Sequence, residues 1–299
     1  MQWSRYFQNE EFLEKTRMGM LLPEMRDAIR GWLGLQEGMR VLDVGCGTGA
    51  YARYLAEGME RAEFFGVDND PNFIARARQT EEKNVTGIQY LVGDALELPY
   101  ENESFDLVVS HTFLTSMPQY KEALSQMRRV CRKGGRISSL AGMTFTAIPM
   151  ELGTYPEQCT WLGRYYELLN KVYAMYQGIV PYQDYANGVS PAKMPRAFYE
   201  AGLKEICVYP VGSFWSLSNA AVPRERKQRY IELDCIAQIK RLEAVWELEE
   251  ARQYLTQEEK DEFIDILRKR HDDLLANIDE NQIWDWSGNG NLLVIGKNE

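Results

Sequence analysis

Short apolar runs alternate with amphipathic stretches between about residue 20 and residue 143 of this chain. The runs are rich in Val, Leu, Ile and Phe, and most of them stop at Gly or Asp, which is typical of buried strands. Five strands are expected, at residues 40–44, 63–67, 88–92, 105–110 and 136–141. The stretches between them have the spacing of helices. Because such connections are crossovers, the alternation predicts a parallel sheet with helices on both faces.

The same pattern resumes towards the C-terminus. Residues 191–201 are expected to form a helix that ends at Gly202, and residues 203–211 a sixth strand. The apolar run at residues 291–297 is expected to form the last strand. The fold class predicted is α/β, with a seven-stranded, mostly parallel, doubly wound sheet and helical insertions that form a cap.

Two segments interrupt this pattern, and we expect them to carry specificity. The first, at 145–190, contains nine aromatic residues: Phe145, Tyr155, Trp161, Tyr165, Tyr166, Tyr173, Tyr176, Tyr182 and Tyr185. They either pack onto the sheet or line a ligand pocket. The second, at 223–288, predicts a helical hairpin, in which Thr256 and Glu259 form a capping box. The hairpin either covers the site or forms a dimer interface.

Composition and charge narrow the class of protein. Hydrophobic residues make up 45% of the chain and charged residues 26%, as in ordinary soluble globular proteins. No apolar run is long enough to span a bilayer, and the N-terminus lacks a signal-peptide core, so no membrane partner is expected. A net charge of −10 argues against a nucleic-acid partner. The five cysteines contain no Cys-x-x-Cys pair, which predicts no metal site and a cytoplasmic location.

The most informative stretch is residues 41–49, which read Val-Leu-Asp-Val-Gly-Cys-Gly-Thr-Gly. Gly45, Gly47 and Gly49 carry no Cβ atom, so a ligand can approach the backbone where the strand turns into a helix. The third glycine comes one residue earlier than in the Gly-x-Gly-x-x-Gly loop that binds dinucleotides. Asp43 would repel a pyrophosphate, whereas it suits a cationic ligand. The loop therefore predicts a site for a ligand other than a dinucleotide.

This stretch closely resembles motif I of the class I S-adenosylmethionine-dependent methyltransferases. The resemblance covers residues 40–143 and resumes near residue 191. It implies S-adenosylmethionine as the cofactor and S-adenosylhomocysteine as the product. It also implies that residues 291–297 run antiparallel between the fifth and sixth strands. In the family this loop cradles the methionine portion of the cofactor, a role that falls here to Asp43, Gly45, Cys46, Gly47 and Gly49.

Residues after the next two strands match further positions of the family. Asp68 follows the second strand, and its carboxylate can accept hydrogen bonds from both ribose hydroxyls. Asn69 is then expected beside the adenine, and Asp94 and Ala95 at its exocyclic amine. A helix cap for Asp68 and a turn for Asp94 are the structural alternatives.

Three other residues complete the candidate site. Arg17 is expected to grip the carboxylate of the cofactor, as an upstream arginine does in related small-molecule methyltransferases, or else to lie on the surface. Ser110, which ends the fourth strand, is expected to contact the cofactor. His111 follows it, and could act as the general base or form part of the pocket wall.

These expectations divide the chain into N-terminal helices or a lid at 1–39, the cofactor-binding core at 40–144, the aromatic-rich insertion at 145–190, the continued core at 191–222, the hairpin at 223–288 and the last strand at 289–299. The expected function is in-line methyl transfer to an N or O atom of a small-molecule acceptor. The alternatives are a non-catalytic protein that binds the cofactor and an aminopropyl-type transferase of the same fold. A monomer and a homodimer both remain open.

Overall fold

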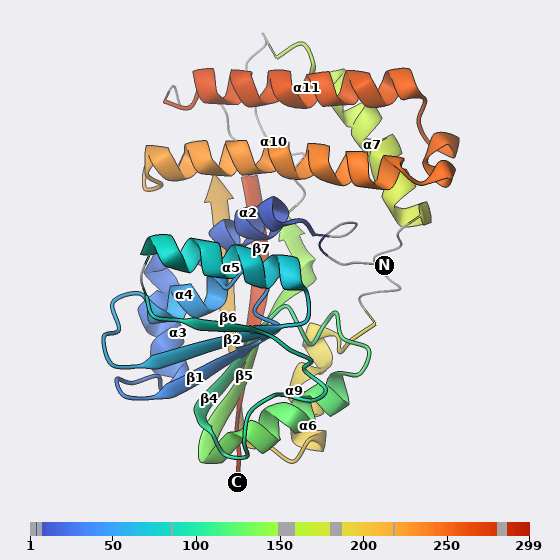
Figure 1. Cartoon of the computed structure of the whole chain (residues 1–299). Helices are drawn as coiled ribbons and strands as arrows, with labels where there is room; N and C mark the ends of the chain where they lie inside the picture. The colour runs from blue at the N-terminus through green and yellow to red at the C-terminus, as the bar shows by residue number, and fades with distance from the viewer. Residues whose placement is uncertain are drawn as a thin grey trace. The chain divides into compact units, whose positions relative to one another are not determined.

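The computed structural model describes residue 4 and residues 8–84, 86–148, 159–179, 187–217, 219–279 and 286–299. The chain divides into two compact units, whose elements are labelled in Figure 1. One, the sheet unit, holds most of each strand and the helices that pack on the strands. The other, the helical unit, holds the N-terminal helix at Glu10–Met20 and the long helices of the two insertions. The glycine loop lies in the sheet unit.

Seven strands form one sheet in the described part of the chain, in the order β3-β2-β1-β4-β5-β7-β6. Their bounds are Arg40–Val44 (β1), Glu63–Asp68 (β2), Gln89–Val92 (β3), Phe105–His111 (β4), Cys131–Ile148 (β5), Lys204–Ser216 (β6) and Trp286–Lys297 (β7). β1 pairs in parallel with β2 and β4, β2 with β3, and β4 with β5. The predicted α/β class with a mostly parallel sheet is therefore confirmed.

β7 runs antiparallel to its two neighbours. Just after its end, Asn298 exchanges backbone hydrogen bonds with Gly134 and Gly135, near the start of β5, at N···O distances of 2.6 and 2.9 Å. Near its beginning, the Asn291 side-chain amide donates to the Val211 carbonyl oxygen, late in β6, at 3.3 Å. The predicted place of the last strand, between the fifth and the sixth, is confirmed.

β5 begins at Cys131, earlier than the predicted start at residue 136. The register explains the difference, because Phe105 of β4 faces Cys131 whereas Leu107 faces Arg136. Two residues of β4 therefore oppose a longer segment of β5, which bulges out of the ladder. Gly134 has a φ of 76° inside this bulge. The local turn signal of the two glycines thus marks an irregularity within a strand.

Helices cover both faces of the sheet. The helical segments of the sheet unit are η1 (Pro23–Met25), α3 (Arg26–Leu33), α4 (Ala50–Ala56), α5 (Pro71–Asn84), α6 (Tyr120–Val130), η3 (Pro191–Lys193) and α9 (Met194–Glu200). One apolar cluster joins the strands to α6 and α9 through Met127 and Phe198. A second cluster joins them to α3, α4 and α5 through Ile29, Leu55 and Ile74. The doubly wound arrangement follows from these two cores.

The helical unit contains the predicted hairpin. Its elements are α2 (Glu10–Met20), α7 (Leu162–Ile179), α10 (Arg224–Trp246), η4 (Glu249–Gln253) and α11 (Gln257–Ala276). α10 and α11 lie side by side (Figure 1), and bury Leu242 and Phe263 from their apolar faces. The capping box is confirmed, because Thr256 Oγ1 accepts from the Glu259 N–H at 3.1 Å and Glu259 Oε2 accepts from the Thr256 N–H at 3.1 Å.

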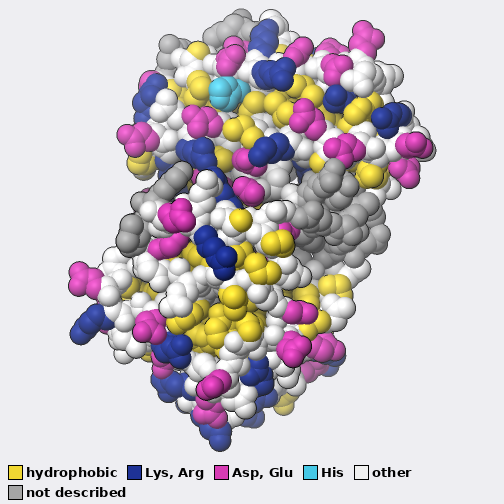
Figure 2. All heavy atoms as spheres, in the orientation of Figure 1, with side chains coloured by type: hydrophobic (Ala, Val, Ile, Leu, Met, Phe, Trp, Pro, Cys, Tyr) yellow, Lys and Arg dark blue, Asp and Glu magenta, His cyan; other side chains and the backbone are white. Residues whose placement is uncertain are grey.

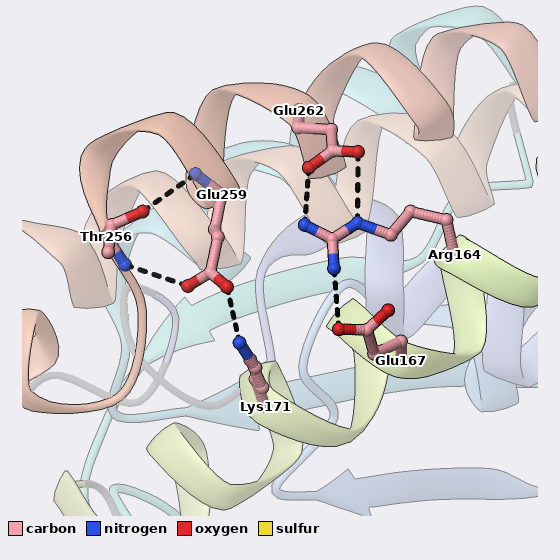
Figure 3. Close-up of polar contacts among 6 residues, drawn as sticks. All are labelled: Arg164, Glu167, Lys171, Thr256, Glu259 and Glu262. Carbon is pink, nitrogen blue, oxygen red and sulfur yellow. Dashed lines mark hydrogen bonds and ion pairs between the residues drawn. The ribbon is translucent and has the colours of Figure 1, made fainter.

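Side chains of α7 bind α11 through a row of polar contacts (Figure 3). Arg164 donates two hydrogen bonds to the Glu262 carboxylate, at 3.0 and 2.7 Å, and a third to Glu167 at 2.6 Å. About two turns after Arg164 along α7, the ammonium of Lys171 pairs with Glu259, the residue that closes the capping box. The start of α11 is therefore tied both to its own cap and to α7.

Aromatic residues of the first insertion fill the interior of the helical unit. Tyr165 is buried, and its ring stacks on that of Phe263 in α11 at a centroid distance of 5.8 Å. Trp161 and Tyr176 are buried as well. These three side chains therefore have a packing role, but they pack against the helical hairpin and not onto the sheet. Tyr155, Tyr182, Tyr185 and the side chain of Phe145 lie outside the described residues.

Candidate functional site

The glycine loop follows β1 and has a backbone that only glycine adopts easily. Gly45, Gly47 and Gly49 have φ angles of 70°, 53° and 77°, in the left-handed region. A Cβ atom on Gly45 would lie 2.2 Å from the ring of Phe113, and one on Gly49 would lie 2.4 Å from the hydroxyl oxygen of Tyr90. The loop therefore needs glycine both for its conformation and for the rings packed against it.

Backbone hydrogen bonds hold the loop on the end of β2. The N–H groups of Gly45 and Cys46 both donate to the carbonyl oxygen of Val67, at 2.8 and 3.0 Å. The N–H group of Gly47 donates to Oδ2 of Asp68 at 2.9 Å. The order of the sheet places β2 beside β1, so these contacts join the loop directly to the candidate ribose-binding carboxylate.

Asp68 is a partly buried carboxylate that accepts hydrogen bonds from backbone N–H groups. Its Oδ1 accepts from the N–H of Asp70 at 2.9 Å, and its Oδ2 accepts from Gly47. Burial raises the pKa of Asp68, and hydrogen bonds from the backbone N–H groups of Asp70, Gly47 and Asn69 offset part of that effect. A carboxylate offers about four acceptor positions, so Asp68 keeps capacity for hydroxyl donors.

The two residues that follow Asp68 have different roles: Asp70 caps a helix, and Asn69 is a candidate for the ligand site. Asp70 is buried, and its Oδ1 accepts from the N–H of Asn72 at 3.0 Å in the first turn of α5. The cap of this helix is therefore Asp70, which leaves Asp68 outside that role. Asn69, between them, is exposed. Its position is compatible with the expected contact to an adenine.

The residues after β3 lie next to Asp68, because the N–H of Gly93 donates to the Asp68 carbonyl oxygen at 3.0 Å. Asp94 is exposed, and its Oδ1 accepts from the Leu96 N–H at 2.9 Å, so it does form the turn that was its structural alternative. Ala95 is buried. The loop, Asp68 and Asp94 are thus brought together at the carboxyl ends of three adjacent strands, where α/β sheets bind ligands.

Ser110 and His111 end β4 at the same edge of the sheet. Ser110 is fully buried, and its hydroxyl donates to the carbonyl oxygen of Ser138 at 3.4 Å. His111 is 5% exposed, and its ring packs against that of Tyr51 in α4 at a centroid distance of 5.2 Å. Thr112 has a left-handed φ of 54°, which is uncommon for a residue with a branched side chain. Strain of this kind clusters at functional sites.

Asp43 and Cys46 lie within the protein beside these groups. Asp43 is 1% exposed. Burial raises the pKa of the Cys46 thiol, and the negative charges of Asp43 and Asp68 raise it further. Burial and Asp43 likewise raise the pKa of the Tyr51 hydroxyl. Both groups therefore stay protonated, so that Cys46 can line a pocket but does not supply a thiolate nucleophile.

Arg17 lies on α2 of the helical unit, where its Nη1 donates to Oγ1 of Thr16 at 3.0 Å. Its expected contact with a cofactor carboxylate stays a prediction. Sequence reasoning missed Tyr51, Tyr90 and Phe113, the rings that pack against His111 and the glycine loop. Only Tyr90 could have been suspected from the sequence, because it is an aromatic residue in a predicted buried strand.

The described residues also bear on two other kinds of site. They contain no group of three or more His, Cys, Asp or Glu side chains placed to hold a metal ion. They also contain no helix that is long and apolar enough to cross a membrane.

Residues 42–139 match a family model described as a methyltransferase domain. The chain is 30% identical over 182 residues to the demethylmenaquinone methyltransferase of Bacillus mycoides strain KBAB4, which covers 60% of this chain and 75% of that relative. It is 33% identical over 138 residues to the fatty-acid O-methyltransferase of Mycolicibacterium smegmatis, covering 43% and 50% of the two chains. The YcgJ protein of Bacillus subtilis aligns in structure over 92% of this chain and 99% of its own, with 16% identity and a TM-score of 0.47.

Proposed function

The chain belongs to the class I S-adenosylmethionine-dependent methyltransferases, and we propose that it transfers a methyl group from this cofactor to an N or O atom of a small-molecule acceptor. The observation that supports this most is the hydrogen bond between Gly47 N–H and Asp68 Oδ2. It joins a loop of left-handed glycines to a partly buried carboxylate that can accept further hydrogen bonds. The residues present therefore fit the cofactor.

Each candidate residue has a distinct part in holding the cofactor. Asp68 accepts the two ribose hydroxyls, and the bare backbone of the glycine loop, with Asp43 and Cys46 behind it, receives the methionine portion. Asn69, Asp94 and Ala95 surround the adenine, Ser110 supports the end of β4, and Arg17 binds the carboxylate. When bound, S-adenosylmethionine supplies a methyl group that its sulfonium has already activated.

The protein has little bond chemistry left to perform. It has to align the acceptor atom with the methyl group and keep water away. His111 is the group proposed to take a proton from the acceptor, because it ends β4 at the edge of the sheet that carries the glycine loop. The two insertions are proposed to hold the acceptor. The similarity to a demethylmenaquinone methyltransferase and a fatty-acid O-methyltransferase suggests testing quinones and fatty acids first.

The proposal is tested in two steps on the purified full chain. Calorimetric titration with S-adenosylhomocysteine is expected to show one site per chain. Incubation with S-adenosylmethionine labelled in its methyl group is then expected to label one class among fatty acids, reduced naphthoquinones and amines.

Other results would decide against the proposal. Failure to bind S-adenosylhomocysteine would contradict the assigned site. Binding without transfer to any acceptor in a broad metabolite extract would favour the non-catalytic protein. Transfer of an aminopropyl group from the decarboxylated cofactor would favour the third alternative.

A further inference from the structure

A cavity of about 590 Å³ opens on the sheet unit between α6 and α9. Its lining includes Asn102 and Glu103, which precede β4, Cys131 and Lys133 at the start of β5, and Asn298 after β7. These are the ends at which the parallel strands begin, whereas the glycine loop follows the carboxyl end of β1. The cavity is therefore at the opposite edge of the sheet from the proposed cofactor site.

Small side chains on two facing helices keep this cavity open. Ser125 of α6, Ala197 of α9 and Ala201 just after α9 line it, and none of them is large enough to fill the space between the helices. Leu124 is buried at the wall, next to the ring of Tyr120. A volume of this size lies within the range of sites for small molecules.

Four cations also line the cavity: Lys121, Arg128, Arg129 and Lys133. The two guanidinium groups are fixed by neutral acceptors. Arg128 Nε donates to Oδ1 of Asn298 at 3.1 Å, and Arg129 donates to the carbonyl oxygens of Leu98 and Tyr100, each at 2.8 Å. Within the part of the chain that the structure describes, no carboxylate forms an ion pair with any of the four. The positive charge of the two guanidinium groups is thus held in place by neutral acceptors.

The carboxylates that line the cavity do not cancel the positive charge of its four cations. Glu200 pairs with Arg196 at 2.7 Å, and Glu299 pairs with Lys297 at 3.2 Å, so each carboxylate has its ion-pair partner outside the lining. Glu103 is the one carboxylate side chain among the described lining residues that has no ion pair. On the face drawn in Figure 2, basic and acidic side chains are interspersed. A surplus of positive charge in a hollow is thus a local feature of a chain whose net charge is −10.

We propose that this cavity is a second ligand site, which takes a small anion with an apolar body, such as an aromatic carboxylate, sulfonate or phosphate monoester. The apolar body packs against Leu124, Tyr120 and Ala197, and the anionic group lies between Lys121 and Lys133. Lysine ammonium groups act as point charges that do not require a planar ligand, which is why the class is defined by charge and not by one functional group.

Naphthalene-1-sulfonate is a suitable probe, because it joins an apolar ring system to one anionic group. Calorimetric titration of the full chain is expected to show one site, whose affinity falls as the salt concentration rises. Naphthalene-1-methanol, which has the same ring system without the charge, is expected to bind at least roughly tenfold more weakly. The site is expected to persist in the presence of saturating S-adenosylhomocysteine.

Matched variants locate the probe. The double variant Lys121→Gln and Lys133→Gln is expected to weaken binding at least roughly tenfold. The control is Lys193→Gln with Lys204→Gln, which removes two exposed lysines of the same unit outside the cavity and is expected to leave binding unchanged. Ser125→Trp, at an exposed position on α6, is expected to fill the cavity and abolish binding.

The proposal is overturned by any of three results. The first is no binding of the probe at millimolar concentration. The second is competition between the probe and S-adenosylhomocysteine, which would place the probe at the glycine loop. The third is equal weakening in the cavity variant and the control variant. Thermal unfolding curves of the four proteins establish that each variant is folded before it is titrated.

Discussion

A buried carboxylate in the helical unit and a partly buried carboxylate in the sheet unit have opposite surroundings. Asp234 of α10 in the helical unit is 3% exposed and pairs with Lys15 of α2 and with Arg270 of α11, the latter at 2.6 Å. Burial by itself would raise the pKa of Asp234, but the two cations outweigh it and lower the pKa to about 2. Asp68 in the sheet unit has two backbone N–H donors, and no cation among the described residues pairs with it. Its pKa is raised by burial.

The difference separates a carboxylate that holds the fold from one that awaits a ligand. Asp234 is satisfied within the helical unit, where it connects three helices that lie far apart in the sequence. Asp68 has been taken out of water without a counter-charge, and it keeps acceptor positions that the protein does not fill. A site that tolerates such a cost in the absence of ligand is a strong functional candidate.

The largest effect is expected from His111, which lies in the same unit as Asp68. If polar groups at this edge serve the reaction, His111→Asn should lower kcat roughly 10²–10⁴-fold, the range for loss of a general base. The measurement is the rate of methyl transfer to the identified acceptor. His271→Asn is the control, because it removes the other histidine, which lies in α11 of the helical unit. A loss of less than about tenfold would leave His111 only a part of the pocket wall.

Asp234→Asn should lower the free energy of unfolding by about 3–5 kcal/mol, because it leaves Lys15 and Arg270 buried without their counter-charge. Urea titration of the variant and the parent protein measures this. Asp265→Asn is the control, since its carboxylate is 76% exposed and pairs with a surface arginine. An unchanged urea midpoint for Asp234→Asn would show that the buried cluster does not hold the helices together.

The same comparison predicts a pH dependence. Asp234 has a lower pKa in the folded protein than its ordinary value of 3.8, so the folded state binds this proton more weakly. Its contribution to stability is complete above about pH 4 and is lost as the pH falls towards about 2. The urea midpoints of the parent and Asp234→Asn proteins should therefore converge in that window. Midpoints that stay apart at pH 2 would contradict the assignment.

Asp68→Asn should act on the ligand and not on the fold. Loss of hydrogen bonds to a charged group is expected to weaken binding of S-adenosylhomocysteine by about 1.5–3 kcal/mol, roughly tenfold to 150-fold. Because the pKa of Asp68 is raised, its ionised form is disfavoured in the folded protein, and stability falls as the pH rises above 3.8. The ligand-free variant should therefore be at least as stable as the parent at pH 7. Asp27→Asn, at an exposed carboxylate of α3, is the control.

Much of the sheet unit could be predicted from the sequence. Strands such as Glu63–Asp68 are short apolar runs that end at Gly or Asp, and the glycine spacing at residues 45–49 is a local signal. Contacts between distant residues gave no such signal. Tyr90 and Phe113 fill the space beside the glycines from other strand ends, which only the folded sheet brings together.

The helical unit illustrates the same limit. The apolar period predicted α10 and α11, and the Thr-x-x-Glu pattern predicted the start of α11. The pairing of Lys15 with Asp234 spans 219 positions, and either residue alone has the pattern of a solvated surface charge. The sequence also could not predict that α7 packs against α11. An aromatic side chain such as Tyr165 can pack on a sheet as well as on the ring of Phe263.

The smallest effect is expected at the capping box, which tests whether stability in the helical unit is independent of the cofactor site. Thr256→Ala removes the acceptor for the Glu259 N–H and should lower the free energy of unfolding by about 1 kcal/mol. Thr256→Ser keeps a hydroxyl there and should restore most of it. Affinity for S-adenosylhomocysteine should stay the same in both, because its proposed ligands other than Arg17 lie in the sheet unit. If Thr256→Ala weakened that affinity, the stability of the helical unit would contribute to ligand binding. The contrast between Asp234, which stabilises the fold, and Asp68, which binds the ligand, would then be wrong.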